Sequence, residues 1–192
     1  LLMPDRGGIR ALLERHLRRG EALLPELQWL DFEPQSTVDD SFTATRMLLE
    51  AGVQAIVVLG GDGTHRAVVR ELVARHAQAR AAGGRPGPPP VPIAGLSTGT
   101  NNAFPELREP TITGLAVGLY ASGRLDAAEA LAANKLLEVR ITAPDGRQRQ
   151  DVAIVDAVIT HDRSVGARAL WKTGSLAAAY LAFAEAEAIG LS

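Results

Sequence analysis

The chain of 192 residues contains no cysteine, only 4% aromatic residues and no long apolar run. The lack of cysteine excludes disulfides, thiolate nucleophiles and metal sites with cysteine ligands. Apolar runs such as residues 55–59 are far shorter than the roughly 20 residues that a membrane-spanning helix needs, and the N-terminus lacks the layout of a signal peptide. We therefore expect a cytoplasmic protein that does not act at a membrane.

An excess of basic charge is also missing. Charged residues make up 22% of the chain and the formal net charge is −2, so no overall positive field attracts a polyanion such as nucleic acid. The apolar share of 46% is enough for the core of one domain, or of a small domain with part of another. Because the chain opens on the apolar run Leu1–Met3 and stops at Ser192 after another, we expect a fragment of a longer protein.

Residues 1–123 alternate between short apolar runs and segments with helical spacing, which predicts parallel strands joined by helices. The run 53–59 is apolar on both faces after its first two residues, so we expect a central strand covered by helices on each side. The proline- and glycine-rich stretch 83–90 predicts a surface connector. The expected strands are 1–3, 53–59 and 91–96, and the expected helices are 9–19, a helix from Asp39 or Asp40 as its cap to Glu50, 64–82, and a helix from Thr111 or Thr113 as its cap to about Gly123.

Past residue 123 the pattern changes. The runs 136–142 and 152–160 are rich in β-forming residues and are joined through Pro144-Asp145-Gly146, a hairpin signal, which predicts antiparallel strands. The alanine-rich segment 175–189 is expected to be helical. The fold class is therefore α/β, with an N-terminal parallel α/β nucleotide-binding domain, 1–123, and the start of a C-terminal antiparallel β domain, 124–192, which is expected to be incomplete.

The strongest chemical signal is Gly60-Gly61-Asp62-Gly63-Thr64, between an expected buried strand and a helix. Glycines at the carboxyl end of a strand let backbone N–H groups approach a phosphate, and the N-terminus of the following helix attracts an anion. Asp62 would repel a phosphate there unless it binds the accompanying Mg²⁺ or accepts a proton from an attacking hydroxyl group. The alternative interpretation is a plain tight turn with a helix-capping Asp or Thr.

A second polar turn, Ser97-Thr98-Gly99-Thr100-Asn101-Asn102, follows the expected strand 91–96. Parallel strands end at the same edge of a sheet, so both turns are expected to face one crevice. Hydroxyl and carboxamide groups there can bond phosphate oxygens or ribose hydroxyls without adding charge. Taken alone, this turn is better explained as a run of good turn formers, but the two turns together favour a nucleotide site. Neither the P-loop sequence nor the Rossmann glycine fingerprint is present.

The two turns, in this order and spacing, resemble the motif pair of the ATP-NAD kinase superfamily, which also includes diacylglycerol and sphingosine kinases. The pair is far more specific than either motif alone, and the resemblance covers nearly the whole chain. Further segments resemble the branch named for acetoin-catabolism protein X (AcoX): His65-Arg66, residues 101–106, Asn134-Lys135, Val155-Asp156, residues 166–171 and residues 189–192.

This resemblance implies an NAD-kinase-like enzyme of two domains with a nucleotide cleft between them. It implies that Asp62 is the catalytic acid/base, that ATP with Mg²⁺ is the phosphoryl donor, and that NAD or a related metabolite is the acceptor. It does not indicate the metal ligands, and a homodimer or tetramer is in keeping with it. The residues implied to hold phosphates are Gly60, Gly61, Gly63 and Thr64, and those implied to line the acceptor side are Thr98, Gly99, Asn101 and Asn102.

One departure from the family concerns the acceptor. Where NAD kinases carry an asparagine-acid pair in the second domain, this chain has Val155-Asp156. A carboxylate among apolar neighbours is costly to bury unpaired, so a nucleotide ligand or another partner is the favoured interpretation for Asp156. The missing asparagine weakens NAD as the acceptor and leaves a non-catalytic NAD- or ATP-binding regulatory module as the alternative. His65 is expected to be exposed or packed rather than to bind phosphate.

Overall fold

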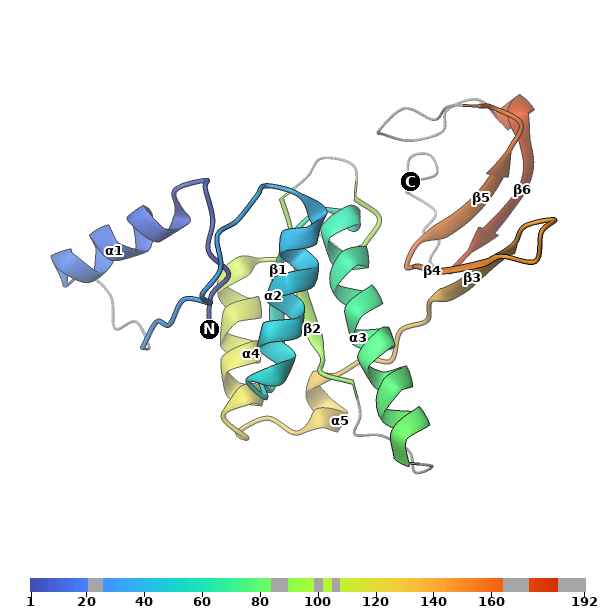
Figure 1. Ribbon diagram of the computed structural model, residues 1–192. Coiled ribbons are helices and arrows are strands. Elements are labelled where there is room, and N and C mark those ends of the chain that lie inside the picture. The colour runs from blue at the N-terminus through green and yellow to red at the C-terminus, as the bar shows by residue number, and fades with distance from the viewer. Residues whose placement is uncertain (21–25, 84–89, 99–101, 105–107, 164–172, 183–192) are drawn as a thin grey trace. The chain divides into compact units, whose positions relative to one another are not determined.

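The computed structural model describes residues 1–20, 26–83, 90–98, 102–104, 108–163 and 173–182. Contacts within residues 1–53 and within residues 54–192 divide the chain into two compact units. Figure 1 shows two helices in the first unit, and helices with paired strands in the second. The expected domain boundary after residue 123 stays a prediction. No helix in the described part of the chain is long and apolar enough to cross a membrane.

The first unit opens with α1 (Ile9–Arg19), which has the bounds expected from its apolar spacing. The Asp5 carboxylate accepts the backbone N–H groups of Ile9 and Arg10 at 3.0 and 3.2 Å. These bonds satisfy donors of the first helical turn that have no partner within the helix.

The strand expected at residues 1–3 is wrong in its extent. Leu2 forms an isolated parallel bridge with Trp29. The N–H of Leu2 donates to the Gln28 carbonyl, and the N–H of Leu30 donates to the Leu2 carbonyl, both at 2.8 Å. Pro4 lies two residues after Leu2, and because proline lacks an N–H donor it cannot extend this pairing.

The second helix, α2 (Val38–Glu50), begins with a reciprocal cap. The Thr37 hydroxyl accepts the N–H of Asp39 at 3.3 Å, while the Asp40 carboxylate reaches back to the N–H of Thr37 at 3.2 Å. We expected Asp39 or Asp40 to be the cap itself, but Thr37 is the cap and Asp40 is its partner. The capping-box arrangement explains the difference, since an acid three residues after a threonine cap bonds back to it.

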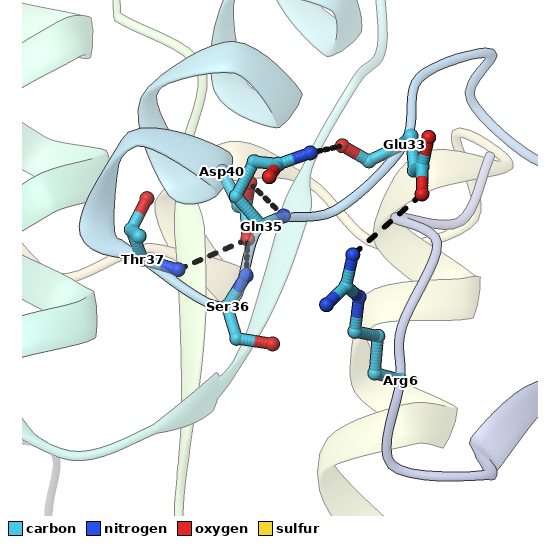
Figure 2. A network of polar contacts seen from close by, with 6 residues as sticks. All are labelled: Arg6, Glu33, Gln35, Ser36, Thr37 and Asp40. Carbon is cyan, nitrogen blue, oxygen red and sulfur yellow. Dashed lines mark hydrogen bonds and ion pairs between the residues drawn. The ribbon is translucent and has the colours of Figure 1, made fainter.

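Asp40 also closes the loop that precedes α2 (Figure 2). Its carboxylate accepts the N–H groups of Gln35 and Ser36 at 2.9 and 2.6 Å, and Ser36 is held at φ 61°. The side chain is buried, and the hydrogen bond from Gln35, with those from Thr37 and Ser36, lowers the pKa of the Asp40 carboxyl. Beside this loop Arg6 pairs with Glu33 at 3.6 Å (Figure 2).

The second unit contains a parallel strand pair, which confirms the predicted fold class. β1 (Ile56–Gly60) pairs with β2 (Ile93–Ser97) in register from Ile56 opposite Ile93 to Gly60 opposite Ser97. α3 (Asp62–Gly83) follows β1 directly and packs on it, with Ile56 and Val58 buried. α4 (Pro110–Ala121) contacts β2, and the short α5 (Ala127–Ala130) contacts α4.

Within the second unit, β1 is covered on one face. α3 packs on β1, with Ile56 and Val58 buried, while Val57 and Leu59 lie on the other face and are 43% and 55% exposed. That helices cover both faces of β1 stays a prediction. A run of consecutive apolar residues has no period of two, so the sequence alone does not show how each face is covered.

The rest of this unit is antiparallel, as predicted. β3 (Leu137–Thr142) pairs with β4 (Gln148–Ala153) across the expected hairpin, where Gly146 has φ 80°. β5 (Asp156–Thr160) pairs with β6 (Leu176–Leu181), which follows the 3₁₀ turn Thr173–Ser175.

Two expectations about this region are wrong. The run 152–160 is not one strand, because the chain bends at Ile154 and Val155 between β4 and β5. Residues 176–181 form a strand rather than a helix, since pairing with β5 outweighs the helical propensity of alanine. The remainder of the expected helix, from residue 183 on, lies outside the described residues.

Candidate phosphate-loop site

The two polar turns leave the sheet next to each other. Because β1 and β2 are parallel and end in register, Gly60 lies opposite Ser97. The N–H of Thr98 donates to the Gly60 carbonyl at 3.4 Å, so the first step of the second turn is still joined to β1. The loops that follow β1 and β2 therefore start from the same edge, as the order of strands and helices predicted.

Asp62, the first residue of α3, joins these two loops. Its carboxylate accepts the N–H of Ala103 at 3.0 Å through Oδ2 and the N–H of Phe104 at 2.8 Å through Oδ1. Its own N–H donates to Asn102 Oδ1 at 3.3 Å. The interpretation of Asp62 as a plain helix cap is wrong, because the described hydrogen bonds of its carboxylate go to the second loop and not to the first turn of α3.

Asn102 is fixed by the same set of bonds. While Oδ1 accepts from Asp62, the amide nitrogen Nδ2 donates to Ser97 Oγ at 2.7 Å. Both ends of the carboxamide are thus bound within the protein, and its orientation is set by partners on both loops. Gly99 and Asn101, predicted for the same loop, lie outside the described residues, while Thr98 is exposed.

The three glycines of the first motif differ in what a side chain would meet. A Cβ on Gly60 would lie 2.7 Å from Thr64 Cβ and Oγ1, and one on Gly61 would lie 2.8 Å from Asn102 Oδ1. Packing therefore explains the first two glycines. A Cβ on Gly63 would meet no atom within 4 Å, and Gly63 is exposed with no positive φ. Nothing described in the structure requires a glycine there.

The start of α3 presents free donors. Of its first three N–H groups, that of Asp62 is bound to Asn102, whereas those of Gly63 and Thr64 have no acceptor among the residues described here. Unpaired N–H groups at a helix N-terminus carry partial positive charge and favour a bound anion. The geometry can therefore hold a phosphate at Gly63 and Thr64, next to a carboxylate whose position is fixed.

His65 has an environment that the sequence could not show. It is 0% exposed, its Nδ1 donates to the Gly61 carbonyl at 2.9 Å, and Nε2 has no partner in the described part of the chain. Its ring meets the Phe104 ring edge-on, with centroids 5.7 Å apart. Burial lowers the pKa of His65, although the bond to Gly61 and the charge of Asp62 oppose this shift. The ring is therefore neutral at pH 7, with its proton on Nδ1.

The next residue on α3 links this region to the antiparallel strands. Arg66 Nε donates to the Val152 carbonyl at 2.9 Å, and its Nη2 pairs with the Asp151 carboxylate. Asp156, predicted to contact the nucleotide, is the half-buried first residue of β5, and Val155 before it is buried.

The described residues contain no ready metal cluster. Within them, no three His, Asp or Glu side chains gather closely enough to hold a metal ion. A shallow hollow of about 460 Å³ lies on the β3–β4 hairpin, lined by Ile141, Ala143, Arg147, Gln148 and Arg149.

Two family models match consecutive parts of the sequence. Residues 5–124 match the ATP-NAD kinase N-terminal domain, and residues 135–192 match the acetoin catabolism protein X C-terminal domain. The chain is 55% identical to acetoin catabolism protein X of Cupriavidus necator over its full length and spans 50% of that relative. No solved structure matches the chain.

Proposed function

The chain belongs to the ATP-NAD kinase family, in the branch of acetoin catabolism protein X, and from this membership we propose that it transfers a phosphoryl group from ATP to a hydroxyl group of NAD or a related metabolite. We place this reaction in the cytoplasm. The proposal concerns the whole protein, since the chain spans about half of the relative that it matches.

The observation that carries the proposal is the pairing of free amides with a fixed carboxylate. The N–H groups of Gly63 and Thr64 are unpaired among the described residues, and Asp62 is held by Ala103 and Phe104. Phosphoryl transfer depends mainly on positioning and on stabilising charge, and both are available here. Gly63 supports the same interpretation, because glycine lowers helix stability and no described contact requires it.

In the proposed reaction Asp62 is the general base. The acceptor hydroxyl oxygen attacks the γ-phosphorus of ATP, the bond from that phosphorus to the β,γ-bridging oxygen breaks, and ADP leaves. The hydroxyl proton passes to a carboxylate oxygen of Asp62. Among the described residues each of these oxygens accepts one N–H bond, which leaves a second lone pair for the hydroxyl group.

Mg²⁺ bound with ATP would neutralise part of the phosphate charge. This ion is commonly held by one or two carboxylates together with substrate phosphates and water. Asp62 offers one such carboxylate beside the free amides of α3, so the residues present fit an ion that enters with the nucleotide. The proposed phosphate ligands are the amides of Gly63 and Thr64, with Gly60 and Gly61 shaping the loop, while Thr98, Gly99, Asn101, Asn102 and Asp156 are proposed for the acceptor side.

The experiment is an assay of NADP formation from ATP, Mg²⁺ and NAD, followed by the same assay with Asp62→Asn. Loss of a general base is expected to lower kcat about 10²- to 10⁴-fold. Asp39→Asn is the matched control, because Asp39 also lies in the first turn of a helix but is exposed in α2. Equal turnover in Asp62→Asn and the control would eliminate Asp62 as the base.

A non-catalytic nucleotide-binding module is the second candidate. It is favoured by the two N–H bonds that Asp62 already accepts, since they give this carboxylate a structural role without any substrate. The burial of Val155, where NAD kinases carry an asparagine, also favours it. Calorimetry that detects tight binding of ATP or NAD, with no transfer to a panel of hydroxyl-bearing acceptors, would support this candidate over the kinase.

A further inference from the structure

His65 combines complete burial with an unsatisfied polar atom. It is 0% exposed in the first turn of α3, and its Nε2 atom has no hydrogen-bond partner among the residues that the structure describes. Burying a ring nitrogen without a partner costs stability, and an apolar ring of similar size would avoid that cost. Stability alone therefore does not account for a histidine here, and the reason must lie with its other ring nitrogen.

That nitrogen, Nδ1, donates to the Gly61 carbonyl at 2.9 Å, and the same carbonyl accepts the backbone N–H of His65 at 3.1 Å. The N–H of the same peptide unit, which belongs to Asp62, donates to Asn102 Oδ1 at 3.3 Å. The peptide between Gly61 and Asp62 is therefore held at both its carbonyl and its N–H end. Since a peptide unit is planar, these bonds together fix the plane of this peptide and, with it, the position of the Asp62 Cα atom.

The imidazole ring also contacts the second loop. It meets the Phe104 ring at an interplanar angle of 77°, with centroids 5.7 Å apart, which is a favourable edge-to-face arrangement. The N–H of Phe104 in turn donates to Asp62 Oδ1 at 2.8 Å. His65 thus contacts both the peptide that carries Asp62 and a residue that holds its carboxylate.

We propose that His65 is a positioning residue for Asp62, which fixes the Gly61–Asp62 peptide through Nδ1 without touching the substrate. The role deepens the proposed function and rests on it, because a fixed carboxylate matters most where Asp62 takes a proton from the acceptor.

Two variants separate the donor from the ring. His65→Asn keeps an N–H donor near the position of Nδ1 and loses the ring, whereas His65→Phe keeps the contact with Phe104 and loses the donor. We expect kcat to fall about a hundredfold in His65→Phe, as for other misplaced catalytic groups, with little change in KM for ATP. In His65→Asn we expect kcat to stay close to the wild-type value. His65→Phe should nevertheless have the higher melting temperature of the two variants. Activity that instead follows the melting temperature would overturn the proposal.

A second measurement does not depend on the reaction. Amide hydrogen exchange at Ala103 and Phe104 reports on the two bonds to Asp62, and we expect exchange to be several-fold faster in His65→Phe and close to wild type in His65→Asn. Unchanged exchange in His65→Phe overturns the positioning role, whether or not the protein is active. If the wild-type protein forms no product but exchange is faster in His65→Phe than in wild type, the positioning role is supported and only the proposed function is contradicted.

Discussion

Two carboxylates of this protein, Asp40 and Asp62, lie in the first turns of helices and accept hydrogen bonds from backbone N–H groups. The donors to Asp40 precede it by three to five residues and form the loop just before α2. The donors to Asp62 follow it by 41 and 42 residues and belong to the other loop at the sheet edge. Asp40 is 6% exposed, whereas Asp62 is half-buried.

This difference separates a carboxylate that serves the fold from one that is available to a ligand. Asp40 satisfies donors of its own loop, so its whole effect is local. Asp62 leaves two N–H groups of its own helix unpaired among the described residues and holds a distant loop instead. Holding the loop after β2 against Asp62 costs chain entropy. It also leaves the free N–H groups of α3 beside a fixed negative charge. Such an arrangement adds little to a helix but suits a site for phosphate and a proton.

The largest loss of stability is expected from Asp40→Asn. The asparagine NH₂ would face backbone donors that now have a carboxylate acceptor, so the melting temperature should fall by several degrees, further than in Asp62→Asn. Thermal unfolding followed by circular dichroism measures both. Phosphoryl-transfer activity should instead be lost in Asp62→Asn and unchanged in Asp40→Asn. Equal falls in melting temperature in the two variants would remove the distinction between the two carboxylates.

The effect of pH on stability provides a control for the Asp40→Asn experiment. Because folding lowers the pKa of Asp40 from an ordinary value of 3.8, its stabilising effect is fully present above that value and is lost as the pH falls through the folded pKa. The difference in stability between wild type and variant should therefore be constant at neutral pH and shrink in acid below pH 3.8.

Alanine substitutions at Gly61 and Gly63 should differ in their effects on stability and on ATP binding. Gly61→Ala places a Cβ 2.8 Å from Asn102 Oδ1 and should lower the free energy of unfolding by about 1–3 kcal/mol, as other overpacked sites do. Gly63→Ala meets nothing within 4 Å and should leave stability unchanged or raise it by less than about 1 kcal/mol. Its methyl group would instead hinder the approach of a phosphate, so calorimetry should show weaker ATP binding. Wild-type ATP affinity in Gly63→Ala would mean that the phosphate does not lie at this amide.

Local patterns in the sequence were sufficient for much of the fold. The helix at 9–19, the parallel order of β1 and β2, and the hairpin at Pro144-Asp145-Gly146 all follow from spacing and turn chemistry. Residues 176–181 were not predictable in this way, because their alanines favour a helix and only the pairing with β5 makes them a strand.

The candidate site was predictable to the level of loops, but not of bonds. Strand order placed the turns after Gly60 and Ser97 at one edge, which the register of β1 and β2 confirms. The bonds from Ala103 and Phe104 to Asp62 depend on the path of the chain beyond the second turn, which no local pattern specifies. For the same reason the sequence left open whether His65 is exposed or packed, although helical spacing places it one turn after Gly61, whose carbonyl it bonds.

His65 should make the loop region sensitive to mild acid. Burial lowers its pKa below the ordinary 6.5, so the unfolded chain gains a proton at this residue before the folded protein does. The free energy of unfolding should therefore fall as the pH drops from 6.5 toward the lowered pKa, and His65 should contribute no slope above that range. Denaturant unfolding of wild type and His65→Phe between pH 5 and 8 measures this, since the variant keeps the other histidines. Identical slopes would mean that His65 titrates alike in both states.

The smallest effect is expected where α3 meets the antiparallel strands. Arg66 and Asp151 are 42% and 39% exposed in their side chains, so solvent screens their attraction, and a double-mutant cycle with Arg66→Gln and Asp151→Asn should give a coupling of about 0.5 kcal/mol that shrinks at high salt. Asp151 also pairs with Arg70 at 3.9 Å, but salt screens that pair, so at high salt Arg66→Gln should cost more than Asp151→Asn, because it also removes the Nε bond to the Val152 carbonyl. Equal single losses, with a coupling that survives molar salt, would show that the pair is shielded from solvent and that the two elements pack more tightly than these exposures indicate.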